Sequence, residues 1–182
     1  VFPGVLMLSI INASFASSSS ALYFMRFTRG IEEILITPFS YLEMLVGFVG
    51  SAVTRALMVS FLILGVGITF GAVHLGNHLL FVFYVSAISA IFAMLGIIVA
   101  LWADSFEQLQ SLNTFVITPL TYLGGIFYSI KMLPEWAQSL SFINPIYYMI
   151  NGIRYTILGV SDSSVSVSFW MALILTVVFT SI

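Results

Sequence analysis

The two histidines of the chain, His74 and His78, have a spacing that could support chemistry. Residues four apart share one face of a helix, and two imidazoles placed this way can bind one metal ion. Zinc takes three or four protein ligands, however, and residues 56–103 contain no aspartate or glutamate. Cysteine is absent as well, which removes thiolate ligands and cysteine nucleophiles. We therefore expect two polar link residues here, and no bound metal or cofactor.

Serine is abundant, yet the chain contains no Gly-x-Ser-x-Gly, the pattern that exposes a nucleophilic serine in hydrolases. Its single lysine, Lys131, is not preceded by the glycine-rich loop that binds nucleotide phosphates. The sequence therefore predicts no catalytic residues, and any ATP hydrolysis would have to take place on another polypeptide.

Arg55 differs from the other charged residues because it interrupts a long apolar run. A charge inside a membrane span costs about 2.5–3.5 kcal/mol on insertion scales. Two interpretations stay open. The side chain could extend to the membrane surface near Glu43, or it could face inward, toward a transport pathway or a helix–helix contact.

The composition explains why an apolar run should be a membrane span. Of the 182 residues, 60% are hydrophobic and only 7% are charged, whereas soluble domains carry roughly 25% charged residues. So few charges exclude a soluble globular enzyme, and five Lys plus Arg residues provide no basic patch for nucleic acid. The charges form small islands separated by apolar stretches, and about 20 apolar residues suffice to cross a bilayer.

These runs predict an all-α integral membrane protein, a polytopic helical bundle with five spans. The spans are expected at residues 4–25, 43–70, 79–102 and 108–130, and from about residue 167 onward. The first span is rich in alanine and serine, so we expect one of its faces to pack closely against protein. The fourth should be interrupted at three helix-breaking residues, Pro119, Gly124 and Gly125.

The polar links between the spans predict short helices. Residues 29–37 form an amphipathic pattern with an acidic face, which favours a protein partner over anionic lipid. Ser40 and Glu43 predict a capping box at the start of the next span. Residues 131–162 predict two short helices at the membrane boundary, the second beginning at Asn144-Pro145 and ending at Gly159.

The charged links also predict an orientation. Residues 26–43 and 103–111 must lie on one side of the membrane, and residues 71–78 and 131–166 on the other. The compact basic pair Arg26 and Arg29 favours a cytoplasmic location for the first two links.

Several short blocks carry a family resemblance through their order and spacing. They are residues 29–38 (RGIEEILITP), 118–128 (TPLTYLGGIFY), 133–136 (LPEW), 144–148 (NPIYY) and the pair Arg154-Tyr155. Together they resemble the ABC-2 type permease family, the transmembrane subunits of bacterial ABC exporters. The resemblance extends over almost the whole chain and is to inner-membrane permeases grouped with drug, polysaccharide and nodulation-factor exporters.

The resemblance implies a single permease domain over residues 1–182 and six spans per complete subunit. The first span would then be missing here, and we expect the C-terminus to be cut as well. It implies a cytoplasmic helix that couples to an ATPase, with Arg29, Glu32, Glu33, Ile34 and Leu35 as its contact residues. It also implies extracytoplasmic re-entrant helices, with Pro134, Trp136, Asn144, Pro145 and Arg154 as their defining residues. Our candidates for the pathway or for helix packing are Arg55, Pro119, Gly124 and Gly125.

The function implied is that of a multi-pass exporter subunit in the bacterial inner (plasma) membrane. It would form a homodimer or heterodimer with two ATPase subunits, which would bind the ATP and Mg²⁺ themselves. The substrate would be amphipathic, or of glycan or lipid type. The alternative is an ATP-independent channel or scaffold subunit, and an intramembrane enzyme is the third hypothesis.

Overall fold

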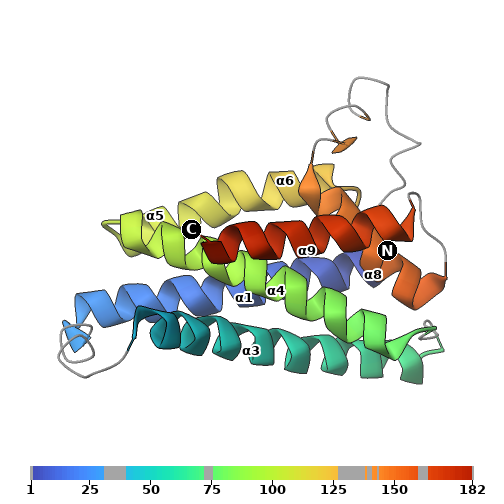
Figure 1. Ribbon diagram of the computed structural model, residues 1–182, viewed down its shortest axis with the longest axis horizontal. Helices are drawn as coiled ribbons and strands as arrows, with labels where there is room; N and C mark the ends of the chain where they lie inside the picture. Colours follow the sequence, from blue (N-terminus) through green and yellow to red (C-terminus); the bar gives the residue numbers. More distant parts are fainter. Residues whose placement is uncertain are drawn as a thin grey trace.

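The computed structural model describes residues 2–30, 40–71, 76–126, 138, 141–142, 144–159 and 164–181. Within these ranges the regular structure is helical throughout, which confirms the predicted all-α class (Figure 1). The helices are α1 (Phe2–Phe27), α3 (Tyr41–Thr69), α4 (His78–Trp102), α5 (Phe106–Leu112), the π-helix η1 (Asn113–Ile117), α6 (Thr118–Leu123), α8 (Pro145–Leu158) and α9 (Val165–Ser181).

Three of these helices are long and apolar enough to cross a membrane: α1, α3 and α4, of 26, 29 and 25 residues. At 1.5 Å per residue each exceeds the hydrocarbon thickness of about 30 Å. The predicted fourth span consists, up to Leu123, of the consecutive helices α5, η1 and α6, and the predicted last span is the shorter apolar helix α9. Three of the five predicted spans are therefore present as long helices.

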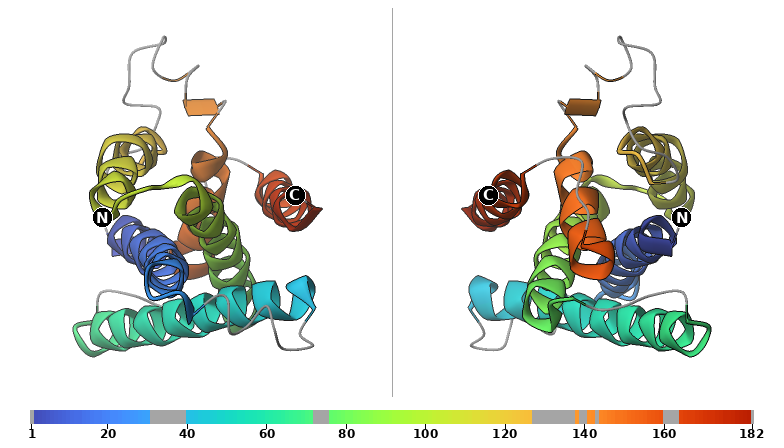
Figure 2. Two further views of the ribbon diagram at one scale, coloured as in Figure 1. Left: turned by 90° about the vertical axis from the view of Figure 1, so that its left-hand side faces the viewer. Right: turned by 90° about the vertical axis from the view of Figure 1, so that its right-hand side faces the viewer.

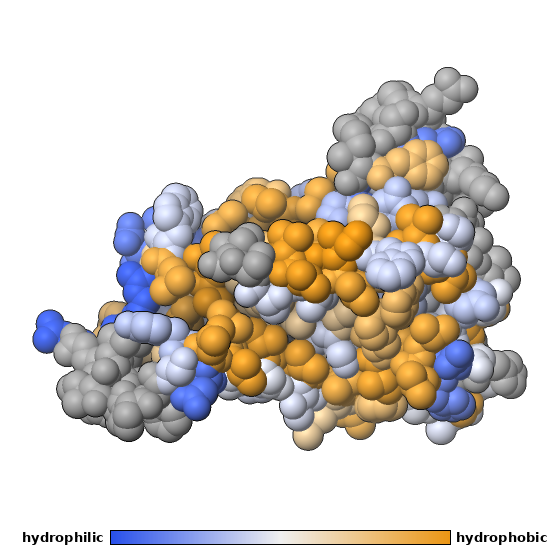
Figure 3. Space-filling model, viewed as in Figure 1, coloured by the Kyte–Doolittle hydropathy of each residue, from blue (hydrophilic) through white to orange (hydrophobic). Residues whose placement is uncertain are grey.

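The core of the bundle lies where α1, α4 and α8 meet, with α3 running across one side of α1 and α4 (Figure 2). Its largest fully buried side chains include Tyr84 and Phe81 of α4, Phe15 of α1 and Ile150 of α8. The face of the molecule shown in Figure 3 carries a broad apolar area along the middle of the helices, while hydrophilic residues gather toward the ends. This distribution is that of a protein surrounded by lipid rather than water.

Local signals in the sequence determine where the helices begin and end. At the start of α3 the Ser40 backbone N–H donates to the Glu43 carboxylate at 2.9 Å, as the predicted capping box requires. Asn144 caps α8 through its side-chain oxygen, which accepts from the Ile146 N–H at 3.0 Å. Gly159 ends α8 with φ +69°, a left-handed conformation that favours glycine. These helix boundaries are confirmed.

Pro119 has a different effect from the break that was predicted. It lies at the first turn of α6, and the helix continues directly from the π-helix η1. Proline has no N–H to donate to the preceding turn, so a wider turn before it removes the conflict. The Thr118 hydroxyl donates to the Asn113 carbonyl five residues earlier at 3.0 Å, which stabilises this wider turn. The interruption at Gly124 is confirmed, because α6 ends there.

Candidate functional site

One face of α1 packs tightly against α4, and we call it the sealed face. Its serines Ser14, Ser18 and Ser19 are buried, and each hydroxyl donates to the carbonyl four residues earlier at 2.7–2.9 Å. Gly96 of α4 lies opposite, where an added Cβ would be 2.8 Å from the Phe15 carbonyl oxygen. The two backbones therefore approach as closely as small residues allow, which confirms the predicted close packing of this span.

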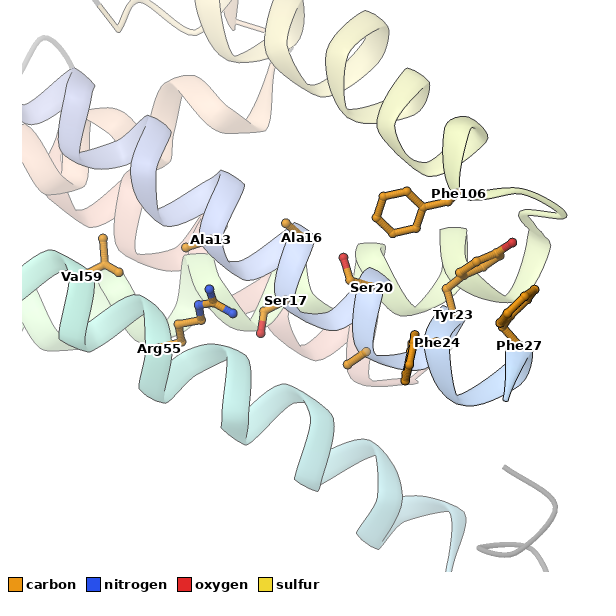
Figure 4. Close-up of a pocket in the computed structure, with 11 residues that line it drawn as sticks. Ala13, Ala16, Ser17, Ser20, Tyr23, Phe24, Phe27, Arg55, Val59 and Phe106 are labelled. Carbon is orange, nitrogen blue, oxygen red and sulfur yellow. The ribbon is translucent and has the colours of Figure 1, made fainter. Parts of the chain in front are cut away.

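A neighbouring face of α1 lines an open pocket of about 900 Å³ between α1 and α3 (Figure 4). Small α1 residues form one wall, Arg55 and Val59 of α3 form another, and Phe106 of α5 lies near one end. Ser17 and Ser20 are half-buried in this wall, and their hydroxyls make no hydrogen bond within the described part of the chain. The remaining lining residues are Ala13, Ala16, Ala21, Tyr23, Phe24 and Phe27.

Arg55 lies midway along α3, roughly 20 Å from either end of the helix at 1.5 Å per residue. Its guanidinium points toward α1, beside Ala13 and Ser17 (Figure 4). Among the residues that the structure describes, none pairs with it or accepts a hydrogen bond from it. Arg55 is exposed on the open side of this pocket, and which of the two interpretations left open by the sequence applies to it stays a prediction.

A second cavity, of about 250 Å³, lies deeper in the bundle among α1, α4, α8 and α9 and the segment around η1. Phe15, Phe92, Met149 and Phe179 are among its lining residues, and its surface is wholly apolar. With no polar group to orient a ligand, it lacks the mixed character of a binding site. The Arg55 pocket is therefore the better candidate.

The end of the bundle next to this pocket is held together by Arg26. Its guanidinium donates to the carbonyls of Ala100 and Leu101 at 2.7 and 2.8 Å, at the C-terminus of α4. A positive charge is favoured there because the last helical carbonyls are unpaired and carry partial negative charge. The Tyr23 hydroxyl also donates to the Asp104 carbonyl, at 3.4 Å. The ends of α1 and α4 therefore lie together at one end of the bundle, and the side of the membrane on which residues 26–43 and 103–111 lie stays a prediction.

The ABC-2 type transporter family model matches residues 1–158, well over half of the chain. The chain belongs to this family. It is 34% identical over 179 residues to the inner membrane transport permease YadH of Escherichia coli strain K12, covering 98% of this chain and 70% of the relative.

Two relatives named nodulation protein J are also similar. That of Rhizobium leguminosarum bv. viciae is 32% identical over 152 residues, 81% of this chain and 57% of the relative. That of Rhizobium meliloti strain 1021 is 33% identical over 140 residues, 74% of this chain and 52% of the relative. The resemblance inferred from the sequence blocks is confirmed at the level of the ABC-2 transport permeases.

At the opposite end of the bundle, several of the residues that the sequence predicted as site residues lie close together. The Asn144 side-chain N–H donates to the Leu120 carbonyl at 2.6 Å, and the Arg154 guanidinium donates to the Gly125 carbonyl at 2.9 Å. Gly124 packs tightly against α8, where an added Cβ would be 3.0 Å from Ile150. Asn144, Arg154 and the two glycines therefore join α8 to the end of α6, a structural role away from the pocket.

The other predicted site residues divide into two groups. Pro119 is exposed and does not line the Arg55 pocket, and Pro145 is the first residue of α8. Arg29 has φ +60° in the turn after α1. The rest, Glu32, Glu33, Ile34, Leu35, Pro134 and Trp136, lie outside the described residues, as does His74.

Sequence reasoning missed two features. Arg26 was considered only as a charge that sets orientation, because spacing along the chain does not show that its partners lie 74 and 75 residues away. Ser17 and Ser20 were not separated from the other serines of α1. The helical period places them on a different face from Ser14 and Ser18, but that period does not say which face meets α4.

Proposed function

We propose that this chain is the transmembrane subunit of an ATP-driven exporter in the bacterial inner membrane. The observation that carries the proposal is the family match over residues 1–158. It is supported by the similarity over 98% of the chain to a relative named an inner membrane transport permease. The substrate would be an amphipathic molecule of lipid or glycan type, moved out of the cytoplasm.

The proposed topology has five spans in this chain, with residues 26–43 and 103–111 in the cytoplasm. Three long apolar helices support it, as does the contact of Arg26 with the end of α4. In this arrangement α5, η1 and α6 cross the membrane together as an interrupted span. Residues 131–158 form the re-entrant pair on the outer side, and α9 is the last span.

Energy would enter through residues 29–37, which we propose as the coupling helix that contacts the ATPase. The sequence supports this through Glu32 and Glu33, whose acidic side chains anionic lipid would repel. Two ATPase subunits and two permease subunits would make one transporter, with ATP and Mg²⁺ bound by the ATPases. The permease itself would carry out no covalent chemistry.

The test is to coexpress the full-length permease with candidate ABC ATPase subunits from the same organism and to purify the complex through a tag on the permease. We expect the ATPase to copurify, and reconstituted vesicles to export amphiphiles from a lipid and glycolipid panel only when ATP is hydrolysed. An ATPase variant that binds but does not hydrolyse ATP serves as the control. A permease that purifies without an ATPase and conducts without ATP would support the channel alternative instead.

A further inference from the structure

The Arg55 pocket contains one full positive charge and no described acidic residue in its lining. Arg55 is exposed in this open pocket, but it lies midway along a helix long enough to span the membrane, and a charge at that depth is costly unless it has a partner or reaches water. No described residue provides that partner. A ligand with an anionic group would compensate the charge and would itself be stabilised at a depth where it otherwise loses its hydration.

The hydroxyls near Arg55 fit the same ligand. Ser14, Ser18 and Ser19 use their hydroxyls on their own helix, whereas Ser17 and Ser20 make no hydrogen bond within the described part of the chain. Of these two, Ser17 lies beside Arg55, and Ser20 points toward Phe106 (Figure 4). A phosphate or carboxylate has several acceptor oxygens and can take hydrogen bonds from a guanidinium and from hydroxyls together. The other polar side chain in the described lining is Tyr23, whose hydroxyl already donates to the Asp104 carbonyl, so Arg55 and the serines are the donors left for an anion.

The rest of the pocket suits an apolar body. From Arg55 and Ser17 the lining continues along α1 to Phe24 and Phe27, with Phe106 on the facing side (Figure 4). Its volume of about 900 Å³ is within the 300–1,000 Å³ typical of small-molecule sites. The pocket therefore runs from the middle of α3 toward the end of the bundle that the charges predict to be cytoplasmic.

We propose that this pocket binds the anionic group of an amphiphile while it is being transported, with Arg55 as the binding residue and Ser17 as an additional donor. The apolar body of the amphiphile lies against the aromatic side chains. This inference rests on the proposed exporter function and narrows its substrate class to amphiphiles that carry a phosphate or carboxylate.

Binding is tested first, without ATP. The full-length permease with its ATPase, in a neutral detergent, is titrated with dioleoyl phosphatidic acid or with dioleoylglycerol, which has the same acyl chains but no phosphate. Native mass spectrometry counts the bound molecules. We expect at least about tenfold tighter binding of the phosphate-bearing probe, the size of one charge-assisted hydrogen bond.

Variants then test whether Arg55 causes the preference for the phosphate-bearing probe. Arg55→Gln should abolish it, and Arg55→Lys should restore most of it because the charge is kept. Ser17→Leu should weaken binding of both probes by occupying the pocket, while Ser51→Leu is the matched control, because Ser51 is exposed on α3 outside the lining. Equal binding of the two probes, or an unchanged preference in Arg55→Gln, would overturn the proposal. So would loss of permease–permease association in Arg55→Gln, because Arg55 would then be an interface residue.

A transport measurement separates a transported molecule from a resident lipid. In proteoliposomes with the ATPase facing outward, fluorescent phosphatidic acid should move to the inner leaflet on ATP hydrolysis, and Arg55→Gln should slow this movement at least about tenfold. Phosphatidic acid that binds through Arg55 but is not moved, while other amphiphiles are, would refute the assignment to transport. If ATP moves no compound and the ATPase does not copurify, the exporter function itself fails, whatever the binding result.

Discussion

Two faces of α1 are built from the same small residues but differ in what they meet. Ser14, Ser18 and Ser19 are buried against α4, where Gly96 leaves room for direct backbone contact. Ser17 points toward α3 and Arg55, and Ser20 points toward Phe106 in the wall of the same open pocket. The comparison shows that a helix face made of small residues can either pack closely against a neighbouring helix or line a pocket. Which of the two occurs depends on the size and charge of the side chain opposite.

The largest expected effect comes from breaking the sealed face at Gly96. Gly96→Leu places a side chain where even a Cβ would be 2.8 Å from the Phe15 carbonyl oxygen, so α1 and α4 must separate. Overpacking of this kind costs typically 1–3 kcal/mol, and a backbone clash lies at the upper end of that range. Unfolding of the purified permease by SDS titration should occur at clearly lower SDS.

The matched control for this substitution is Gly65→Leu in α3, because nothing lies within 4 Å of the position of an added Cβ there. This variant should be at least as stable as the wild type, since leucine favours a helix by about 1 kcal/mol over glycine. Equal destabilisation by both variants would mean that the α1–α4 contact is not the tight one.

Two serines of α1, Ser18 and Ser20, lie on different faces, so their substitution should have different effects. Ser18 is 1% exposed, so Ser18→Leu should destabilise the bundle by about 1–3 kcal/mol through overpacking. Ser20 is half-buried in the pocket wall, so Ser20→Leu should leave stability within about 0.5 kcal/mol of the wild type but reduce transport. SDS unfolding and ATP-dependent transport are measured on both variants. The opposite pattern would show that the sealed and open faces have been assigned the wrong way round.

How much of the fold and of the candidate site could be predicted from the sequence depends on how far apart along the chain the interacting residues are. The helix caps at Ser40, Asn144 and Gly159 were predicted because a cap involves residues within a few positions of one another. The close packing of α1 followed from residue size alone. The direction of Arg55 stayed open, because it depends on where α1 lies relative to α3, and no spacing along the chain encodes that.

The π-helix η1 shows a similar limit. Pro119 was recognised as a helix breaker, but a proline can be accommodated by a kink, a break or a wider turn. The choice depends on side chains such as Thr118, whose hydroxyl satisfies the Asn113 carbonyl. Likewise, a basic residue at the end of one span is a visible feature, but the α4 carbonyls that Arg26 contacts could be found only in the folded chain.

A smaller effect is expected at the end of α1, where both faces terminate. Arg26→Gln removes the charge that binds the last carbonyls of α4, and favourable charges at helix ends contribute about 0.3–1 kcal/mol when exposed. The SDS unfolding midpoint should fall modestly, and Arg26→Lys should recover part of the loss. Arg29→Gln is the control, because the Arg29 side chain has no hydrogen bond among the described residues. An equal effect of the two variants would point to net charge rather than to the α4 contact.

The smallest expected effect concerns the flank of α1 between its two faces. There the Asn113 side-chain N–H of η1 donates to the Asn12 carboxamide oxygen at 3.2 Å, while the Asn113 oxygen is buried without a partner among the described residues. Hydrogen bonds between membrane helices are worth about 0.6 kcal/mol on average. Asn12→Leu should therefore cost about that much, and the double variant with Asn113→Leu should cost less than the sum of the two single variants. SDS unfolding of all four proteins gives the coupling energy. A coupling of zero would mean that α5, η1 and α6 are held to α1 by apolar packing alone, and that the flank adds no polar contact to the sealed face.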